Sequence, residues 1–182
     1  MYRLAGTFIQ VINNILENTF GRNIIPQNEE ERLENLKKYK ILYTKSEPIF
    51  DQLAAVAATM LKVPLAMINF VDKDHVWTKA NQRGDSGDEV ERGTSLCSLA
   101  ILKGEVTVFE NALVEPCLMS NPLVVGEFGL RFYAAVPITT SEGFNIGAVC
   151  IVDKKVRSFT PKDREKLEWI AQLIQIEIEK RA

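Results

Sequence analysis

The chain has 182 residues, of which 46% are hydrophobic and 25% are charged, and its formal net charge is −2. This length fits one domain with appendages, and the composition is that of a globular protein with a substantial core. The nearly balanced charge gives no electrostatic reason to expect nucleic acid or an anionic membrane as a partner. A single histidine excludes a histidine-rich metal site.

The three cysteines are Cys97, Cys117 and Cys150, an odd number with wide spacing. A chain of this size does not need disulfides to stabilise its core, so free thiols in a reducing compartment are the simpler interpretation. We therefore expect a cytoplasmic protein. The spacing is not typical of a zinc site, and no bound metal is expected.

The first twenty residues are rich in apolar side chains but are not typical of a signal peptide. Gln10, Asn13 and Asn14 interrupt the apolar stretch, no cleavage pattern of small residues follows, and the segment is too polar to span a membrane. Apolar residues at helical spacing predict an amphipathic helix that packs on protein: Leu4, Phe8, Val11, Ile12, Ile15 and Leu16. We interpret residues 1–28 as a helical extension and residues 29–182 as the main domain.

Two more helices are expected before the first strand. Asn28 and Glu31 have the spacing of a capping box for a helix over residues 29–42, and Ser46 can cap the next helix. The latter carries an apolar stripe at steps of three and four residues: Phe50, Leu53, Val56, Ala57 and Met60.

Short apolar runs predict strands over residues 65–71, 75–80, 106–109, 131–138 and 145–153. The first of these is apolar apart from Asn69, which indicates a central strand buried on both faces. Residues 81–92 are polar and contain two glycines, so they predict a loop. The last two strands form an antiparallel hairpin, with Gly147 at a point of close approach.

Between the strands lie two segments that could cover a pocket. Thr94 and Ser95 can cap a short helix that contains Cys97. Residues 110–127 contain two prolines and two asparagines among scattered apolar residues, which predicts a long ordered loop or short helices. Loops of that length inside a compact domain are often functional.

The last helix begins at Thr160 and Pro161, a capping residue followed by a proline at the first helical position. It carries two apolar stripes, one of Leu167, Ile170, Ala171, Ile174 and Ile178 and another of Trp169, Leu173 and Ile176. A helix that covers only its own sheet needs one stripe. The second stripe is therefore either a partner surface or a surface that the first helix covers within one monomer.

Five segments of the second half of the chain form a recognisable set: residues 95–101 (SLCSLAI), 106–112 (VTVFENA), 121–124 (NPLV), 130–138 (LRFYAAVPI) and 143–153 (GFNIGAVCIVD). In these segments the sequence resembles the bacterial GAF domains found in sensor kinases and cyclic-dinucleotide enzymes. The resemblance covers about residues 33–180 and is sharpest in the predicted hairpin.

The resemblance implies an α+β, sandwich-like fold with a central, largely antiparallel sheet of about six strands. Helices from both termini would cover one face, and a loop-covered pocket would lie on the other. Members often dimerise through terminal helices and relay ligand binding or redox state to an output domain. We expect this chain to be a stand-alone module that forms a homodimer through its terminal helices.

Two departures from the family pattern lie in the segment over the pocket. Asn111 stands where the subfamily usually has an aspartate, and residues 115–118 (EPCL) stand where Asp-x-Arg-Phe is common. Since both changes alter the cover of the pocket, no ligand or cofactor can be transferred from relatives.

The candidate pocket residues are Phe70, Trp77, Lys79, Ser95, Cys97, Asn111, Arg131 and Tyr133. Arg131 could hold a carboxylate or phosphate in a forked geometry, or form an internal salt bridge with Asp72 or Glu110. Tyr133 lies two residues further along the same strand and therefore shares the face of Arg131.

The cysteines also leave alternatives open. Cys97, at the start of a helix, is a candidate redox or ligand-contact residue, or else a small buried apolar side chain. Cys150 lies inside a buried strand and is interpreted as core, whereas Cys117 could pair with Cys97 if the two meet.

The sequence thus predicts a sensory or regulatory GAF module in signal transduction that binds an unidentified small molecule, a signalling protein partner or both. No catalytic motif is present, so an enzyme is not expected. Two alternatives stay open: an enzyme similar to free methionine-(R)-sulfoxide reductases, and a structural interaction domain whose pocket is filled by its own side chains.

Overall fold

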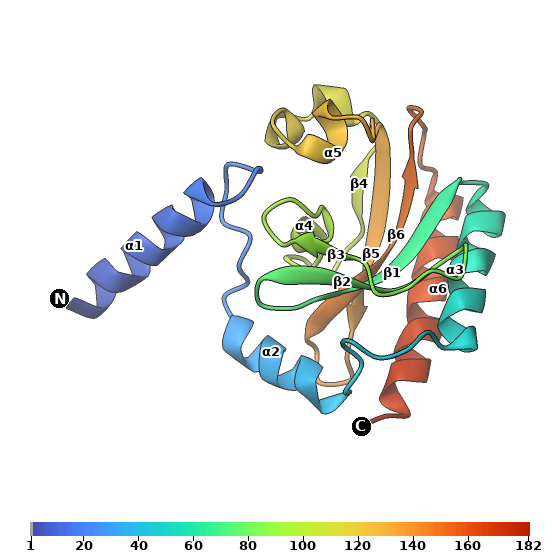
Figure 1. The fold of residues 1–182 in the computed structure, drawn as a ribbon, viewed down its shortest axis with the longest axis horizontal. Coiled ribbons are helices and arrows are strands. Elements are labelled where there is room, and N and C mark those ends of the chain that lie inside the picture. The colour runs from blue at the N-terminus through green and yellow to red at the C-terminus, as the bar shows by residue number, and fades with distance from the viewer. Residues whose placement is uncertain (1) are drawn as a thin grey trace.

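The computed structural model describes residues 2–182, with side chains from Ile9 onward (Figure 1). Its helices are α1 (Tyr2–Leu16), α2 (Glu29–Lys38), α3 (Pro48–Leu61), α4 (Cys97–Ala100), α5 (Pro122–Val125) and α6 (Pro161–Glu179). Its strands are β1 (Leu65–Val71), β2 (His75–Asn81), β3 (Glu89–Glu91), β4 (Thr107–Phe109), β5 (Phe132–Thr139) and β6 (Asn145–Asp153). Two 3-10 turns, η1 (Ala112–Val114) and η2 (Pro116–Leu118), precede α5.

The six strands form one sheet in the order β3-β2-β1-β6-β5-β4, and every neighbouring pair is antiparallel. This confirms the α+β fold with a central antiparallel sheet. The edge strand β3 lies within residues 81–92, where the sequence predicts only a loop, because three residues are too few to show a strand pattern.

Alternate side chains of the strands point to opposite faces and build two separate cores. On the helical face, strand residues such as Ile68 and Phe132 pack against α3 and α6. Residues of the first stripe of α6 are all buried there, as expected: Leu167, Ile170, Ala171, Ile174 and Ile178. On the other face, which we call the lid face, α4, η1, η2 and α5 cover the sheet. Each large apolar side chain buried in this way contributes about 1.5–3 kcal/mol.

The N-terminal helix α1 projects away from the domain on the side opposite α6 (Figure 1). The expectation that helices from both termini share one face is therefore wrong for α1, and α1 does not cover the second stripe of α6. The segment after α1 instead inserts Phe20 and Ile24 into the lid-face core. Thr19 anchors this segment, because its amide donates to the Gly93 carbonyl at 2.9 Å.

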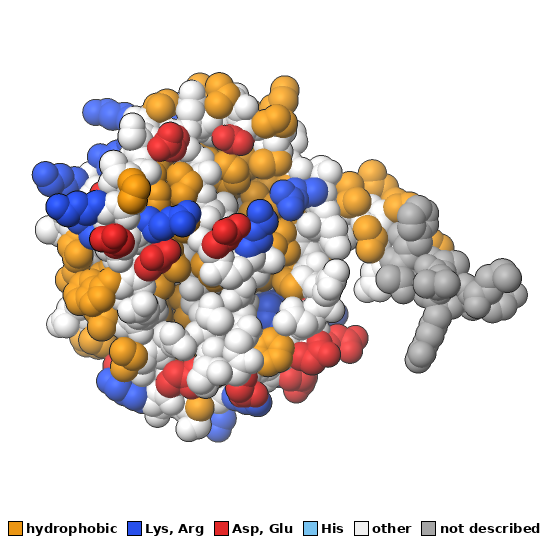
Figure 2. All heavy atoms as spheres, turned by 180° about the vertical axis from the view of Figure 1, so that it is seen from behind, with side chains coloured by type: hydrophobic (Ala, Val, Ile, Leu, Met, Phe, Trp, Pro, Cys, Tyr) orange, Lys and Arg blue, Asp and Glu red, His pale blue; other side chains and the backbone are white. Residues whose placement is uncertain are grey.

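Two of the three residues of the second stripe of α6 are exposed, with 47% of Trp169 and 59% of Ile176 accessible to solvent. The third, Leu173, packs partly against the helical-face core. Next to it, α3 exposes Ile49 and Val56. Figure 2 shows hydrophobic side chains gathered at the side of the molecule where α3 and α6 lie. Since α1 does not cover this stripe, the interpretation of the stripe as a partner surface is the one that remains a prediction.

Helix starts follow the sequence prediction in one case and depart from it in three. Thr160 and Asp163 form a capping box at α6, as residue types there predict. The box expected at Asn28 is wrong, because that side chain makes no capping hydrogen bond, and Glu47 rather than Ser46 is the N-cap of α3. The cap expected at Thr94 or Ser95 is wrong as well, because the N-cap of α4 is Leu96, which makes no side-chain hydrogen bond. None of the described helices is long and apolar enough to cross a membrane.

Candidate functional site

The lid over the sheet consists of single helical turns that begin at prolines and asparagines. Asn111 and Asn121 accept hydrogen bonds through Oδ1 from the amides of Leu113 and Leu123, both at 3.1 Å, which starts η1 and α5. The Asn121 amide nitrogen also donates to the Thr94 carbonyl at 2.8 Å and so ties α5 to the segment before α4. Residues 110–127 are therefore short helices, one of the two forms that the sequence predicts.

Beneath this lid four side chains from four elements form a buried group that we call the thiol cluster: Asn69 of β1, Cys97 of α4, Tyr133 of β5 and Cys150 of β6. The Asn69 amide nitrogen lies 3.3 Å from the Cys97 sulfur and 3.6 Å from the Cys150 sulfur. The Tyr133 hydroxyl donates to the Cys97 sulfur at 3.3 Å. The antiparallel register, in which Asn69 faces Ala148, places Asn69 diagonally beside Cys150 on the same face.

The two thiols of the cluster differ in acidity. The hydrogen bond from Cys150 lowers the pKa of Cys97 to about 7, and donors on Asn69, Tyr133 and Ser95 reinforce it against the opposing effect of burial. The pKa of Cys150 is raised well above its usual value, because its hydrogen bond to Cys97 and its burial favour the neutral thiol. Cys97 is therefore the member of the pair that ionises first.

One atom of the cluster lacks a partner. The Oδ1 atom of Asn69 is buried and accepts no hydrogen bond in the structure, although the amide nitrogen of the same side chain serves both sulfurs. A buried acceptor without a donor costs about 1–3 kcal/mol. This oxygen is therefore a natural contact for a water molecule or a ligand with a donor group.

Arg131 lies on the lid face beside Tyr133 but makes no salt bridge in the structure. Its Nη1 donates to the carbonyls of Val124 and Leu130, both at 2.9 Å, and so fastens α5 to the start of β5. The expected salt bridge with Asp72 or Glu110 is wrong: the Asp72 carboxylate accepts from the Tyr43 hydroxyl, and the Glu110 carboxylate accepts from the Phe159 amide.

Phe70, Trp77 and Lys79 lie on the helical face, away from the lid, so the expectation that they line a pocket with Cys97 is wrong. Successive side chains of a strand point to opposite faces of the sheet. Since Asn69 points to the lid face, its neighbour Phe70 points to the helical face. Phe70 and Trp77 belong to the core under α3. The Lys79 ammonium is buried against Glu47 Oε1 at 2.6 Å.

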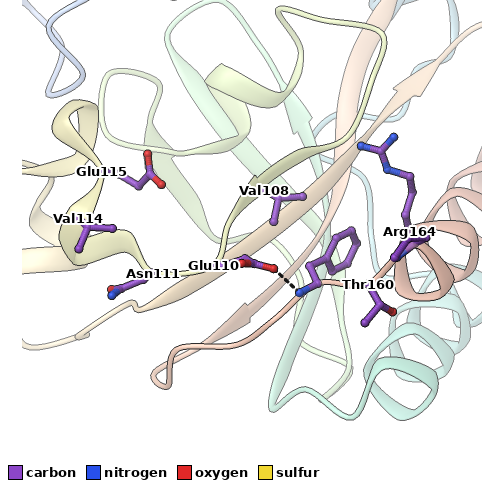
Figure 3. A pocket seen from close by; sticks show the side chains of 9 residues that line it. Val108, Glu110, Asn111, Val114, Glu115, Thr160 and Arg164 are labelled. Carbon is purple, nitrogen blue, oxygen red and sulfur yellow. Dashed lines mark hydrogen bonds between the residues drawn. The ribbon is translucent and has the colours of Figure 1, made fainter.

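Asn111 lies elsewhere again, at an open groove beside the edge strand β4 with a volume of about 670 Å³. Figure 3 shows Glu115 on one side of this groove and Arg164 of α6 on the other. The eight predicted residues therefore occupy three places: the lid face, the helical face and this edge groove. Ser95, Cys97, Arg131 and Tyr133 share the first of them.

The sequence prediction missed Asn69 and assigned Cys150 to the core alone. The signal for Asn69 was present, since it is the one polar residue in an otherwise apolar strand and such a residue needs a buried partner. The meeting of Cys97 with Cys150 had no signal, because it depends on the pairing of β1 with β6 and on the position of α4. Among the described residues, no group of three or more His, Cys, Asp or Glu side chains is arranged to hold a metal ion.

Residues 46–178 match the model of the GAF domain family, and this range contains α3, the whole sheet and all but the last residue of α6. This chain belongs to the GAF domain family. A cyclic di-GMP phosphodiesterase of Pseudomonas aeruginosa is 30% identical over 154 residues, which are 84% of this chain and 26% of that protein. The chain thus spans about a quarter of the length of this relative.

Solved structures with the same fold come from several contexts. The GAF domain of an Acinetobacter phosphoenolpyruvate-protein phosphotransferase superposes with a TM-score of 0.59 at 16% identity, covering 82% of this chain and 94% of that one. A free methionine-R-sulfoxide reductase from Neisseria meningitidis, solved with its substrate, gives 0.59 at 18% identity, covering 82% and 87%. At these identities the likeness extends to the GAF fold.

Proposed function

We propose that this GAF domain is a sensory module whose lid face receives a small-molecule signal and whose α3–α6 surface passes it to a second copy or a protein partner. The observation that carries the proposal is the buried, unpartnered Oδ1 of Asn69 beneath a lid made of single helical turns. Short turns held by a few hydrogen bonds open at low cost, so a ligand donor can reach that oxygen. The same location is supported by the GAF family membership.

The test of ligand binding uses native mass spectrometry of the purified protein and thermal-shift screening with nucleotides, amino acids and haem. A ligand of the lid face raises the melting temperature of the wild type and of Ser120→Ala, an exposed control. It has no effect on Asn69→Leu, which removes the unpartnered oxygen. If every ligand that binds also stabilises Asn69→Leu equally, binding takes place elsewhere and the edge groove beside Asn111 is the next site to test.

The assembly part of the proposal rests on the exposed apolar surface of α3 and α6. Homodimer formation through the terminal helices is supported by the exposure of Trp169 and Ile176 beside Val56, since large contiguous apolar surfaces on a monomer mark interaction sites. Light scattering should find a dimer for the wild type and for Val125→Glu, which changes another exposed apolar residue, on α5. Trp169→Glu should give a folded monomer, and a dimer of unchanged affinity would refute this interface.

The activity of the phosphodiesterase relative belongs to a protein of which the matching region is only 26%. For this chain, which matches only part of that protein, we infer a regulatory role and not a catalytic one. A second candidate function, a reductase of free methionine-(R)-sulfoxide, is supported by the acidic thiol of Cys97 beside Cys150. Turnover of that sulfoxide with a thioredoxin system, lost in Cys97→Ser and kept in Cys117→Ser, would establish the enzyme instead of the sensor.

A further inference from the structure

Cys97 and Cys150 have the arrangement of a reactive thiol and its resolving partner. Their sulfurs both lie within hydrogen-bonding distance of one nitrogen, the Asn69 Nδ2 atom, at 3.3 and 3.6 Å. The two cysteines are more than fifty positions apart in the sequence and belong to α4 and β6. Nothing in the antiparallel pairing of the sheet requires a cysteine at either position, so the meeting of the two sulfurs is a property of this sequence in this fold.

The surroundings assign different states to the two sulfurs. Hydrogen bonds from Cys150, Asn69 and Tyr133 stabilise a thiolate on Cys97, whereas Cys150 keeps its proton. A thiolate is the form that attacks an electrophile, so Cys97 reacts first. The neighbouring Cys150 thiol resolves the product into a disulfide by giving up its proton as its sulfur attacks. The third cysteine, Cys117 of η2, lacks this support, because partial burial and the charge of Glu115 raise its pKa.

We propose that Cys97 and Cys150 are a dithiol site oxidised by hydroperoxides, with Cys97 as the attacking sulfur and Cys150 as the resolving sulfur. The Cys97 thiolate attacks the terminal oxygen of the hydroperoxide, the O–O bond breaks, an S–O bond forms, and the leaving oxygen takes a proton to become water or an alcohol. The Cys150 sulfur then attacks the sulfenic acid, the S–O bond breaks, the disulfide forms, and the hydroxide departs with the Cys150 proton as water. In total two thiols lose two electrons and two protons, and the hydroperoxide gains them.

The site also has a contact for the oxidant and a route to it. The unpartnered Asn69 Oδ1 can accept a hydrogen bond from the O–H group of a hydroperoxide.

Cys97 is 2% exposed, so access requires opening of the lid. Since α4 has four residues and lacks a side-chain cap, its local opening is inexpensive compared with unfolding of the sheet. Oxidation therefore proceeds from the folded protein at a rate that lid opening limits.

This inference goes beyond the sensory proposal and does not need it. A domain that binds a ligand without redox chemistry leaves the pair reduced, and a redox pair in a domain that binds no ligand still forms the disulfide. The two proposals therefore fail separately.

The test is peptide mapping by mass spectrometry after treatment of the full chain with hydrogen peroxide and alkylation of the remaining thiols in denaturant. We expect a Cys97–Cys150 disulfide, an intact mass about 2 Da lower, and Cys117 alkylated. Cys117→Ser behaves like the wild type. Cys150→Ser should stop at a sulfenic acid on Cys97, about 16 Da heavier and captured by dimedone.

The wild-type map decides the pairing even if Cys150→Ser, in a fully buried strand, does not fold. Recovery of both Cys97 and Cys150 as alkylated thiols, oxidation of Cys117 before Cys97, or a Cys97–Cys117 disulfide would each overturn the proposal.

Discussion

The amide nitrogen of Asn69 donates to the sulfur of Cys97 at 3.3 Å and so connects the central strand β1 to the lid helix α4. The contact lies in the middle of the lid-face core, where both side chains are buried. A polar group in such a place needs a partner, and each residue supplies one for the other. The contact is also one of the hydrogen bonds that, after the effect of Cys150, hold the pKa of Cys97 below its usual value.

Replacement of the amide should therefore change the titration of Cys97. In Asn69→Leu the thiolate loses a donor, and hydrogen bonds to charged groups contribute about 1.5–3 kcal/mol, so the pKa of Cys97 should rise by about one unit or more from its value near 7. Tyr133→Phe removes the second donor and should act in the same direction. The measurement is thiolate absorbance at about 240 nm against pH in a Cys117→Ser background. A titration that is unchanged in both variants would show that neither group stabilises the thiolate.

The guanidinium of Arg131 should control the dynamics of the lid. In Arg131→Met the two hydrogen bonds to the Val124 and Leu130 carbonyls are lost, and each contributes about 1 kcal/mol. Amide hydrogen exchange in residues 122–130 should become about tenfold faster, while exchange in β1 and β6 stays the same. Arg164→Met, which removes an exposed arginine at the start of α6, is the control. Equal protection in both variants would contradict a fastening role for Arg131.

Lys79 should contribute to stability far more than a surface lysine does. Its ammonium is fully buried and binds Glu47, the Thr44 hydroxyl and the Lys45 carbonyl at 2.6–2.7 Å. Lys79→Met removes this donor from all three groups, of which only Glu47 keeps another charged partner, Arg181. The change should lower the free energy of unfolding by about 2 kcal/mol or more. Lys37→Met breaks a fully exposed pair with Glu34 and should leave the stability nearly unchanged, because water screens such pairs. Urea denaturation of both variants measures the difference.

The carboxylate of Glu29 should stabilise the folded domain at neutral pH, and this contribution should be lost in acid. Burial raises its pKa, but hydrogen bonds and charges of Arg32 and Arg92 outweigh burial and hold the pKa below the usual 4.5. A lowered pKa in the folded state stabilises the protein above the unfolded value, and the contribution is lost as the pH falls through 4.5 and then through the folded value. Glu29→Gln should flatten this part of the pH profile in chemical denaturation. Glu30→Gln, which removes the same charge from an exposed neighbour, should leave the slope intact.

Gly147 should tolerate no side chain. A Cβ atom there would lie 2.2 Å from the Asn69 carbonyl oxygen of the paired strand, a contact that backbone movement alone can relieve. Gly147→Ala should therefore destabilise the domain by about 2–3 kcal/mol and disturb the thiol cluster through β1. Gly104→Ala, in open space, should change thermal stability by less than about 0.5 kcal/mol. If both alanine variants have the same melting temperature as the wild type, the close approach of β1 and β6 at this point is not rigid.

Local patterns in the sequence were sufficient for most elements of this fold. The short apolar runs of the strands and the Thr160–Pro161 start of α6 depend on residues close together in the chain. Together with Gly147 they predicted an antiparallel α+β domain, the buried stripe of α6 and a point of close approach in β6. The GAF family membership was equally visible, because it depends on the same residues.

The tertiary structure decided which of these elements meet. A shift of one position in a strand changes the face of a side chain, and this placed Phe70, Trp77 and Lys79 under α3 although their residue types suit a pocket. The position of α1 away from α6 depended on where Phe20 and Ile24 find apolar contacts. Asn69, Cys97 and Cys150 come from three separate segments and meet only when β1 pairs with β6 and α4 lies over both, so the sequence supplied the thiols and the fold made them a pair.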